Sequence, residues 1–491
     1  MASLKQFFVH YGQLFTGQAF SVLLGLISFP ILTRLMTPEE YGMLGLVMST
    51  MFLMVAVAKA GLSDGIIRFH KEFSDTEERR TIFSSTIIMR GLALAIAVAG
   101  IYLFLFPEVM PYLGIKSEYA GAFMVMSAYL FLRPMNVTVL NVLRANGNIF
   151  AYTLVNFFGK LTSIVLSLII FIGFIPEVYG YFIGVALSEA VIAAALYFWY
   201  FRHYRVTVAA TSSELAFELI KFGAPLLMTE LAYLLLTYID RYMIVRYYGE
   251  ASLGLYSVGH NLAMYVGDAI MFPLSYAIIP IYVSLFQSQG QEATRQFLER
   301  CLHYLLAAAI PICVGYLAVS EELIVTLASQ KYVLASTFSP VILLATVFLA
   351  ANYILSAGLY LQKKTTVLLA IMLATVIVNV AANLILLPRY GIEGAAYAKL
   401  AATAFSSLAT VALSRRYLFV HVNVKVLAYY LGLSALMYVL VGQIYIEPQW
   451  VSLIVKIIVC AIIIILGVLL REKELREILI KFRRKRADSE I

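Results

Sequence analysis

The chain has 491 residues, of which 62% are hydrophobic and 13% charged, and its mean hydropathy is +0.88. A soluble domain is about half apolar and about one quarter charged, so these values exclude a soluble protein and indicate a polytopic membrane protein. The net charge of +8 would favour nucleic acid as the partner of a soluble protein. In a membrane protein, the positions of the basic residues along the chain instead indicate which side of the membrane each loop lies on. We expect no nucleic-acid partner.

Apolar stretches of about twenty residues, bounded by charge, Gly or Pro, predict an all-α integral membrane protein with about fourteen spanning helices. We expect spans near residues 11–33, 41–62, 81–106, 119–143, 149–173, 179–201, 216–241, 252–286, 296–319, 335–361, 365–387, 392–414, 424–446 and 450–470. No loop exceeds about twenty residues, which leaves no room for a soluble catalytic domain.

The placement of Lys and Arg predicts how the spans are oriented. About 23 of them lie at the two ends and in the even-numbered loops, against about five on the other side. By the positive-inside rule, both termini of this multi-pass cell-membrane protein are expected in the cytoplasm. The first span lacks an A-x-A-like cleavage site, so it is expected to remain as a signal anchor.

Two loop segments have the composition of membrane-surface helices. The segment IIRFHKEF, within residues 63–80, is amphipathic and predicts a helix at the membrane interface. The C-terminal REKELREILIKFRRKR is basic and suits anionic lipid, although most such tails only set topology.

An internal repeat with an offset of about 212 residues relates the two halves of the chain. TPEEYGMLGL resembles GEASLGLYS, with Gly42 and Gly254 in matching places, and IPEVYG resembles LPRYG at nearly the same offset. Transporters place their substrate between such repeats. The expected division is an N-lobe of spans 1–6 (residues 1–205), a C-lobe of spans 7–12 (206–420), spans 13–14 (421–470) and a basic cytoplasmic tail (471–491).

A polar face interrupts the fourth span. Arg133, Asn136, Asn141 and Arg144 follow one another at i, i+3, i+8 and i+11, which is one side of a helix. Arginine at membrane depth costs at least about 2.5–3.5 kcal/mol on insertion scales, so it usually faces a bundle interior or water. We interpret this face as the lining of a path; the alternative is that Arg133 bonds to carbonyl groups of a neighbouring helix.

Other basic residues also lie within predicted spans. Arg90 and Lys160 lie two to four turns inside spans of the first half, and Lys399 is the only intramembrane lysine of the second half. Lys59, near the inner end of its span, could equally extend its ammonium to the surface. Lys456, near the outer end of the last span, is predicted to do so.

The acids within the spans have a different distribution. Glu189 lies on span six, whereas Glu230 and Asp268 lie on spans seven and eight. Glu230 and Asp268 each belong to a stripe of polar residues at helical spacing, which favours a wet face over an inert protonated acid. Asp240 and Arg241 are expected to form a structural ion pair or a helix-end cap.

The chemistry of these residues suits anion binding better than catalysis. Arginine binds diphosphate oxygens in pairs, so a cationic path favours such an anion. The chain has no P-loop, no G-x-S-x-G and no H-E-x-x-H motif, and its three cysteines lack metal-ligand spacing. We therefore expect no enzyme, no catalytic residue, no cofactor and no metal.

Three segments carry a resemblance to a known family: LTRLMTPEEYGMLGL, IDRYMIVRYYGEASLGLYSVG and NLILLPRYGIEGAAYAKLAA. They resemble the loop-and-helix signatures of the polysaccharide transporter family. These are the O-antigen (Wzx-type) and exopolysaccharide flippases of the MOP superfamily, which also holds the MATE exporters and lipid II flippases. The resemblance implies two lobes forming a V and movement of a polyprenyl-diphosphate-linked oligosaccharide to the outer leaflet. The family's cation-lined cavity makes Arg34 a further candidate, and the first span lacks the coupling Asp of the MATE pattern.

The leading hypothesis is therefore a flippase for polysaccharide biosynthesis that works by alternating access. Its partners would be the lipid-linked glycan and membrane lipids, with a glycan polymerase and export machinery as further candidates. The alternatives are a MATE-like cation-coupled multidrug exporter and an integral-membrane glycan polymerase or glycosyltransferase. We expect Arg133 or Arg90 near Glu230 or Asp268 in a closed, substrate-free state. The predicted substrate-binding residues are Arg133, Arg90, Lys160, Arg34, Lys59, Asn136, Asn141 and Lys399, and the predicted coupling or gating residues are Glu230, Asp268 and Glu189.

Overall fold

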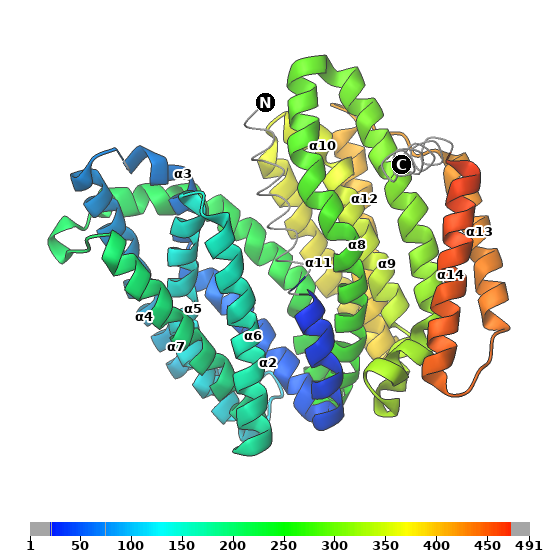
Figure 1. The fold of residues 1–491 in the computed structure, drawn as a ribbon, viewed down its shortest axis with the longest axis horizontal. Helices are drawn as coiled ribbons and strands as arrows, with labels where there is room; N and C mark the ends of the chain where they lie inside the picture. The colour runs from blue at the N-terminus through cyan, green and yellow to red at the C-terminus, as the bar shows by residue number, and fades with distance from the viewer. Residues whose placement is uncertain (1–19, 21, 74, 473–491) are drawn as a thin grey trace, which may run out of the picture. The chain divides into compact units, whose positions relative to one another are not determined.

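The structure, a computed structural model, describes residue 20 and residues 22–73 and 75–472, with the backbone alone for 269–277. Throughout this part of the chain the elements are helices joined by short loops (Figure 1). After a first helix at Val22–Leu35, the α-helices are α2 (Pro38–Lys59), α3 (Leu62–Phe69), α4 (Glu77–Val109), α5 (Ala120–Ala145), α6 (Ile149–Gly173), α7 (Val178–His203), α8 (Ser213–Leu327), α9 (Ser339–Leu355), α10 (Ala357–Leu361), α11 (Thr365–Tyr390), α12 (Ile392–Ser414), α13 (Val424–Gly442) and α14 (Gln449–Arg471). Four short 3-10 helices join them: η1 (His70–Phe73), η2 (Ser117–Tyr119), η3 (Val208–Ala210) and η4 (Gln330–Ser336).

Within the described residues, twelve helical segments are long and apolar enough to cross a membrane, two of them parts of α8. Gly249 and Gly290 within α8 have φ angles of +77° and +82°, a conformation that interrupts a right-handed helix. Figure 1 accordingly shows α8 as successive rods that reverse direction. With α8 separated into three spans and Val22–Leu35 taken as the first, the fourteen predicted spans are accounted for. The predicted all-α membrane fold is confirmed.

The signature TPEE begins α2 with a capping box. The Thr37 hydroxyl accepts a hydrogen bond from the Glu40 backbone N–H at 3.2 Å, and the Glu40 carboxylate accepts one from the Thr37 N–H at 2.8 Å. Pro38 occupies the first helical turn, where its missing N–H costs nothing. Asn423 caps α13 in a related way, by accepting from backbone N–H groups with its side chain. These local signals fix where the helices start.

The chain divides into two compact units by its internal contacts. One unit comprises the chain up to Val258 together with Leu369–Ala402, and the other comprises Gly259–Leu368 together with the chain from Thr403 onward. We describe each unit by itself. The lobes expected from the repeat have other boundaries and stay a prediction. The predicted tail beyond residue 472 and the start of the first predicted span lie outside the described residues.

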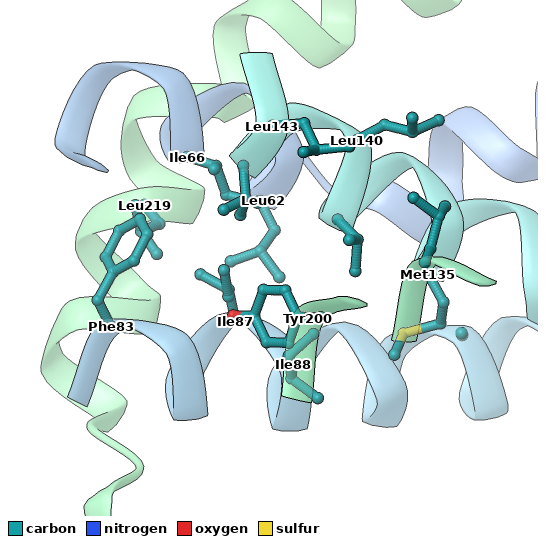
Figure 2. Close-up of a cluster of buried hydrophobic side chains, with 14 of the residues drawn as sticks. Leu62, Ile66, Phe83, Ile87, Ile88, Met135, Leu140, Leu143, Tyr200 and Leu219 are labelled. Atoms are coloured by element: carbon teal, nitrogen blue, oxygen red, sulfur yellow. The ribbon is translucent and has the colours of Figure 1, made fainter. Parts of the chain in front are cut away.

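An apolar core in the first unit includes α3 (Figure 2). Leu62 and Ile66 of α3 have exposed fractions of 1% and 0%, and they pack with residues of α4, α5, α7 and α8. The labelled residues of this core are Leu62, Ile66, Phe83, Ile87, Ile88, Met135, Leu140, Leu143, Tyr200 and Leu219. The apolar face of α3 therefore contacts protein, and the position predicted for IIRFHKEF at the membrane interface stays a prediction. Amphipathicity has the same pattern whether its apolar face meets lipid or a protein core.

Positions related by the repeat face each other in the first unit. A Cβ atom added to Gly42 of α2 would lie 2.7 Å from the backbone nitrogen of Gly254 in α8. One turn along, a Cβ at Gly45 would lie 2.9 Å from the Ser257 hydroxyl oxygen. Both pairs are 212 residues apart in the sequence. Helices can approach this closely only where small residues meet, so the repeat signature is also a packing signature.

We expect Gly254→Ala to destabilise the protein, because the new methyl carbon would lie 1.9 Å from the Pro38 carbonyl oxygen. Such overpacking costs about 1–3 kcal/mol. Gly100→Ala in α4 is the matched control, since nothing lies within 4 Å of its added Cβ. Thermal unfolding of the two purified variants in detergent checks this: Gly254→Ala should melt below wild type and Gly100→Ala should not. Equal midpoints would contradict the close contact.

Candidate functional site

An ion pair joins the middles of two helices in the first unit. Arg133 lies about 20 Å along α5 from Ala120, at about 1.5 Å per residue. Its Nη1 lies 3.2 Å from Oε1 of Glu189 on α7. The Asn136 side-chain amide, one turn further along α5, donates to Oε2 of Glu189 at 2.7 Å and to the Glu189 carbonyl oxygen at 3.0 Å. Glu189 is thus held from both sides.

The Arg133 side chain keeps unused hydrogen-bonding capacity. A guanidinium carries five N–H donors, and only one hydrogen bond from Arg133 to a described residue is formed, the one to Glu189. The side chain is 30% exposed, whereas that of Glu189 is 8% exposed. The charge of Arg133 is therefore compensated by Glu189, while part of its side chain stays exposed. That combination suits a cation that binds an anion in a transient way.

A second ion pair joins the end of α2 to α8. The Lys59 ammonium donates to both carboxylate oxygens of Glu230, at 2.6 and 2.8 Å, and the two side chains are 14% and 36% exposed. Lys59 is thus bound to a carboxylate, and its role in substrate binding stays a prediction. Burial raises the pKa of the Asp64 carboxyl on α3, while the charge of Lys59 acts to lower this pKa.

The contact expected between Arg133 or Arg90 and Glu230 or Asp268 in a closed, substrate-free state stays a prediction, and the contacts of Arg133, Arg90 and Glu230 described in this structure are with other residues. Glu230 is held by Lys59, and Arg133 is held by Glu189. Arg90 donates from Nη2 to the Ser213 hydroxyl oxygen at 2.6 Å. Asp268 belongs to the second unit. Lys59, Arg90 and Arg133 thus contact acids or hydroxyls of their own unit.

A fully buried network surrounds Asp240. Its carboxylate, with an exposed fraction of 0%, lies 3.0 Å from the Lys399 ammonium and accepts from the Tyr256 hydroxyl at 2.8 Å and the Asn383 amide at 2.9 Å. Lys399 also donates to the Thr237 carbonyl oxygen. Asp240 of α8 and Lys399 of α12 hold the two helices together, so we interpret their contact as structural. A substrate role for Lys399 stays a prediction.

Asp240 has the structural ion pair expected at this place, and its partner is Lys399. Arg241 instead donates from Nη1 to the carbonyl oxygen of Gly45 at 2.6 Å. Neighbouring residues on a helix point in different directions, and the true partner of Asp240 lies on another helix. Sequence spacing within one span carries no signal for such a contact.

The other predicted residues have varied surroundings. Asn141 on α5 donates to the Ser63 carbonyl oxygen at 2.9 Å and so ties α5 to α3. Lys160 on α6 is partly exposed, and Arg34 is exposed. Their roles in substrate binding stay predictions.

Lys456 of the last span differs from the prediction that its ammonium extends to the membrane surface. Its side chain is 9% exposed and forms an ion pair with Glu322 of α8, within the second unit. Met437 of α13 and Cys460 of α14 belong to an apolar cluster beside α8. The predicted extension of Lys456 to the surface is therefore wrong, because a carboxylate on another helix compensates its charge.

Comparison with models of known families shows to which family the chain belongs. The sequence model of the family described as "Polysaccharide biosynthesis protein" matches residues 10–286, more than half of the chain. The chain belongs to this family. A MatE family model also matches residues 225–385, in agreement with membership of the MOP superfamily. The resemblance seen in the three loop signatures is confirmed.

The individual proteins compared with this family member are 16% to 28% identical to it over the aligned residues. A protein of the Lsg locus of Haemophilus influenzae is 28% identical over 149 residues, which are 29% of this chain and 37% of that protein. The chain thus aligns with little more than a third of that relative's length. Among solved structures, the lipid II flippase MurJ in an inward closed conformation is 16% identical, with a TM-score of 0.77 over 94% of this chain and 99% of its own. An inward-facing MATE multidrug transporter of the MOP superfamily is also 16% identical, with a TM-score of 0.69 over 81% and 94%. These likenesses show the fold.

We expect Lys399→Met to destabilise the protein strongly, because it leaves the Asp240 carboxylate buried without its counter-charge. Breaking such a pair costs about 3–5 kcal/mol, whereas replacing both charges is often neutral. The double variant Asp240→Asn/Lys399→Met should therefore recover most of the lost stability. Thermal unfolding in detergent measures both, with Lys221→Met, an exposed lysine of α8, as the control. A double variant as unstable as the single one would rule out the charge argument.

Proposed function

We propose that this chain is a flippase that moves a polyprenyl-diphosphate-linked oligosaccharide from the cytoplasmic to the outer leaflet for polysaccharide biosynthesis. Family membership and the transporter fold support a role in the export of glycan precursors. The observation that carries the proposal is Arg133: a guanidinium in the middle of a membrane span, partly exposed, with N–H donors beyond its single bond to Glu189.

The chemistry of a diphosphate fits this arginine. Guanidinium groups bind phosphate oxygens in pairs through charge-assisted hydrogen bonds, which are stronger than neutral ones. Glu189, fixed by Asn136, lowers the cost of a charge at membrane depth and orients Arg133. The diphosphate can therefore use the remaining donors while the contact with Glu189 persists. Arg90, Lys160 and Arg34 complete the proposed cationic set.

Alternating access would follow from exchange of ion pairs. Glu230 is 36% exposed, so an incoming anion could replace it on Lys59 and loosen the contact between α2 and α8. Glu230, Asp268 and Glu189 remain the proposed coupling or gating acids. Outward movement of about two negative charges down an inside-negative potential releases roughly 4.6 kcal/mol per 100 mV. Basic side chains that move with the substrate would cancel part of this.

The cellular setting completes the proposal. Both termini would lie in the cytoplasm of a cell-membrane protein, in line with the placement of Lys and Arg. A glycan polymerase and export machinery would act on the translocated product. The transported glycan would belong to the O-antigen or exopolysaccharide class, and no enzymatic step would be required of this chain.

We expect Arg133→Gln to reduce glycan export in transporter-null cells at least about tenfold, the change for loss of one charge-assisted hydrogen bond. Because this variant also leaves Glu189 uncompensated, the decisive comparison is Arg133→Gln/Glu189→Gln. Removing both charges should restore protein level in the membrane and leave export low. Arg202→Gln, at the end of α7, is the matched control and should export normally. Normal export by the double variant would show that Arg133 is only structural.

The second candidate is a MATE-like exporter of organic cations, which the MatE match over residues 225–385 favours. It requires acids more than arginines. We expect instead that Glu230→Gln impairs glycan export less than Arg133→Gln, and that proteoliposomes accumulate no organic cation under a proton or sodium gradient. Accumulation that Glu230→Gln abolishes would favour the exporter.

An integral-membrane glycan polymerase or glycosyltransferase is the third alternative. Incubation of the purified chain with labelled lipid-linked glycan tests it. We expect no new glycosidic bond, and one formed by the purified chain would show that translocation is not its sole function.

A further inference from the structure

A pocket of about 620 Å³ lies in the second unit, away from the ion pairs described above. Its walls come from the part of α8 that follows Gly290, from the segment that leads into α13, and from Glu472 at the end of α14. All three are ends of membrane-spanning helices. The pocket therefore lies where the hydrocarbon core of a bilayer gives way to water. Its volume is in the range of small-molecule sites, about 300–1,000 Å³.

In this pocket, two glutamate carboxylates each use only one of their two oxygens for hydrogen bonds to described residues. The Glu472 Oε1 atom lies 2.8 Å from Nε2 of His303 and accepts a hydrogen bond from the Tyr430 hydroxyl at 3.0 Å. The Glu299 Oε1 atom lies 2.8 Å from Nδ1 of His421. The Oε2 atoms of both glutamates have no hydrogen-bond partner among the described residues. Each carboxylate thus keeps one oxygen for a donor from a ligand.

Arg300 supplies a positive charge to the same pocket. Arg300 is exposed, lines the pocket, and makes no hydrogen bond or ion pair with any described residue. Leu302, Leu306 and Val426 add an apolar wall. The lining therefore offers a guanidinium, two carboxylate oxygens and an apolar surface together.

A ligand that matches this lining carries a negative group, a positive group with N–H donors and an apolar part. A simple anion such as phosphate would satisfy Arg300 but would meet the two glutamates. A phosphoethanolamine headgroup satisfies all three features, since its phosphate suits a guanidinium and its ammonium suits carboxylates. A choline headgroup has no N–H donor, and a phosphatidylglycerol headgroup has no positive charge.

We propose that this pocket binds the headgroup of a phosphoethanolamine lipid from the surrounding membrane. The phosphate lies on Arg300 and the ammonium lies between the free oxygens of Glu299 and Glu472. The glycerol and the start of the acyl chains lie on Leu302, Leu306 and Val426. The lipid is a bound partner of the second unit and differs from the transported substrate, so this site is independent of the proposed flippase activity.

Native mass spectrometry of the full chain tests the proposal. The purified protein is given equal amounts of phosphatidylethanolamine, phosphatidylcholine and phosphatidylglycerol, and the retained lipid is identified. We expect phosphatidylethanolamine to be retained about tenfold over the other two, the ratio for one charge-assisted hydrogen bond. Equal retention, or a preference for phosphatidylglycerol, would overturn the proposal.

Variants locate the site. Arg300→Gln and Glu299→Gln should each remove the preference for phosphatidylethanolamine, while Arg295→Gln should keep it. Arg295 is the matched control because it lies on the same helix and pairs with Glu292, and neither residue lines the pocket. Thermal midpoints equal to that of Arg295→Gln show that the variants are folded. An unchanged preference in folded Arg300→Gln would place the lipid elsewhere and overturn the assignment.

A competition experiment separates the lipid from its soluble counterpart. Free phosphoethanolamine carries the same two charges and no apolar part. We expect it to displace the lipid only at concentrations far above that of the lipid. Displacement at equal concentration would assign the pocket to soluble phosphate esters and overturn the membrane source.

Discussion

The cost of a charge inside a membrane is the constraint on which the rest of this structure depends. Charged side chains at that depth persist only where another group compensates them. Arg133–Glu189 joins α5 to α7, Lys59–Glu230 joins α2 to α8, and Lys456–Glu322 joins α8 to α14. Each contact brings together segments far apart in the chain. The same charges that are expensive in isolation therefore specify which helices pack together.

The buried charges differ in how much of their hydrogen-bonding capacity is used. Asp240 has an exposed fraction of 0% and accepts bonds from three side chains, so its geometry leaves no place for a ligand. Arg133 is partly exposed and uses few of its donors. A saturated pair stabilises one arrangement of helices, whereas an unsaturated pair can exchange its partner. Transport needs both kinds, because a moving element must turn about a fixed one.

The sequence predicted the elements well and their contacts poorly. Spans, helix starts such as Thr37, and the family follow from local patterns of hydropathy, capping and loop motifs. The partners of Lys59, Arg133 and Lys456 do not, because Glu230, Glu189 and Glu322 lie on other helices and no rule of spacing connects them. Lys456 shows the cause: position near a span end favours extension to water, and only the fold reveals a carboxylate within reach. The amphipathic pattern of α3 likewise predicted a helix, and only the fold shows which residues its apolar face contacts.

The close contact between Gly42 and Gly254 also limits how this chain can change over time. The two glycines occupy equivalent places in the repeat, and a side chain on either would strike the backbone of the opposite helix. Copies of a duplicated segment normally accumulate substitutions independently of each other. Here the two copies are each other's surroundings, so neither glycine can be replaced without rearrangement of the other copy. Divergence between the halves must then concentrate away from this contact, as in the unequal distribution of their intramembrane charges.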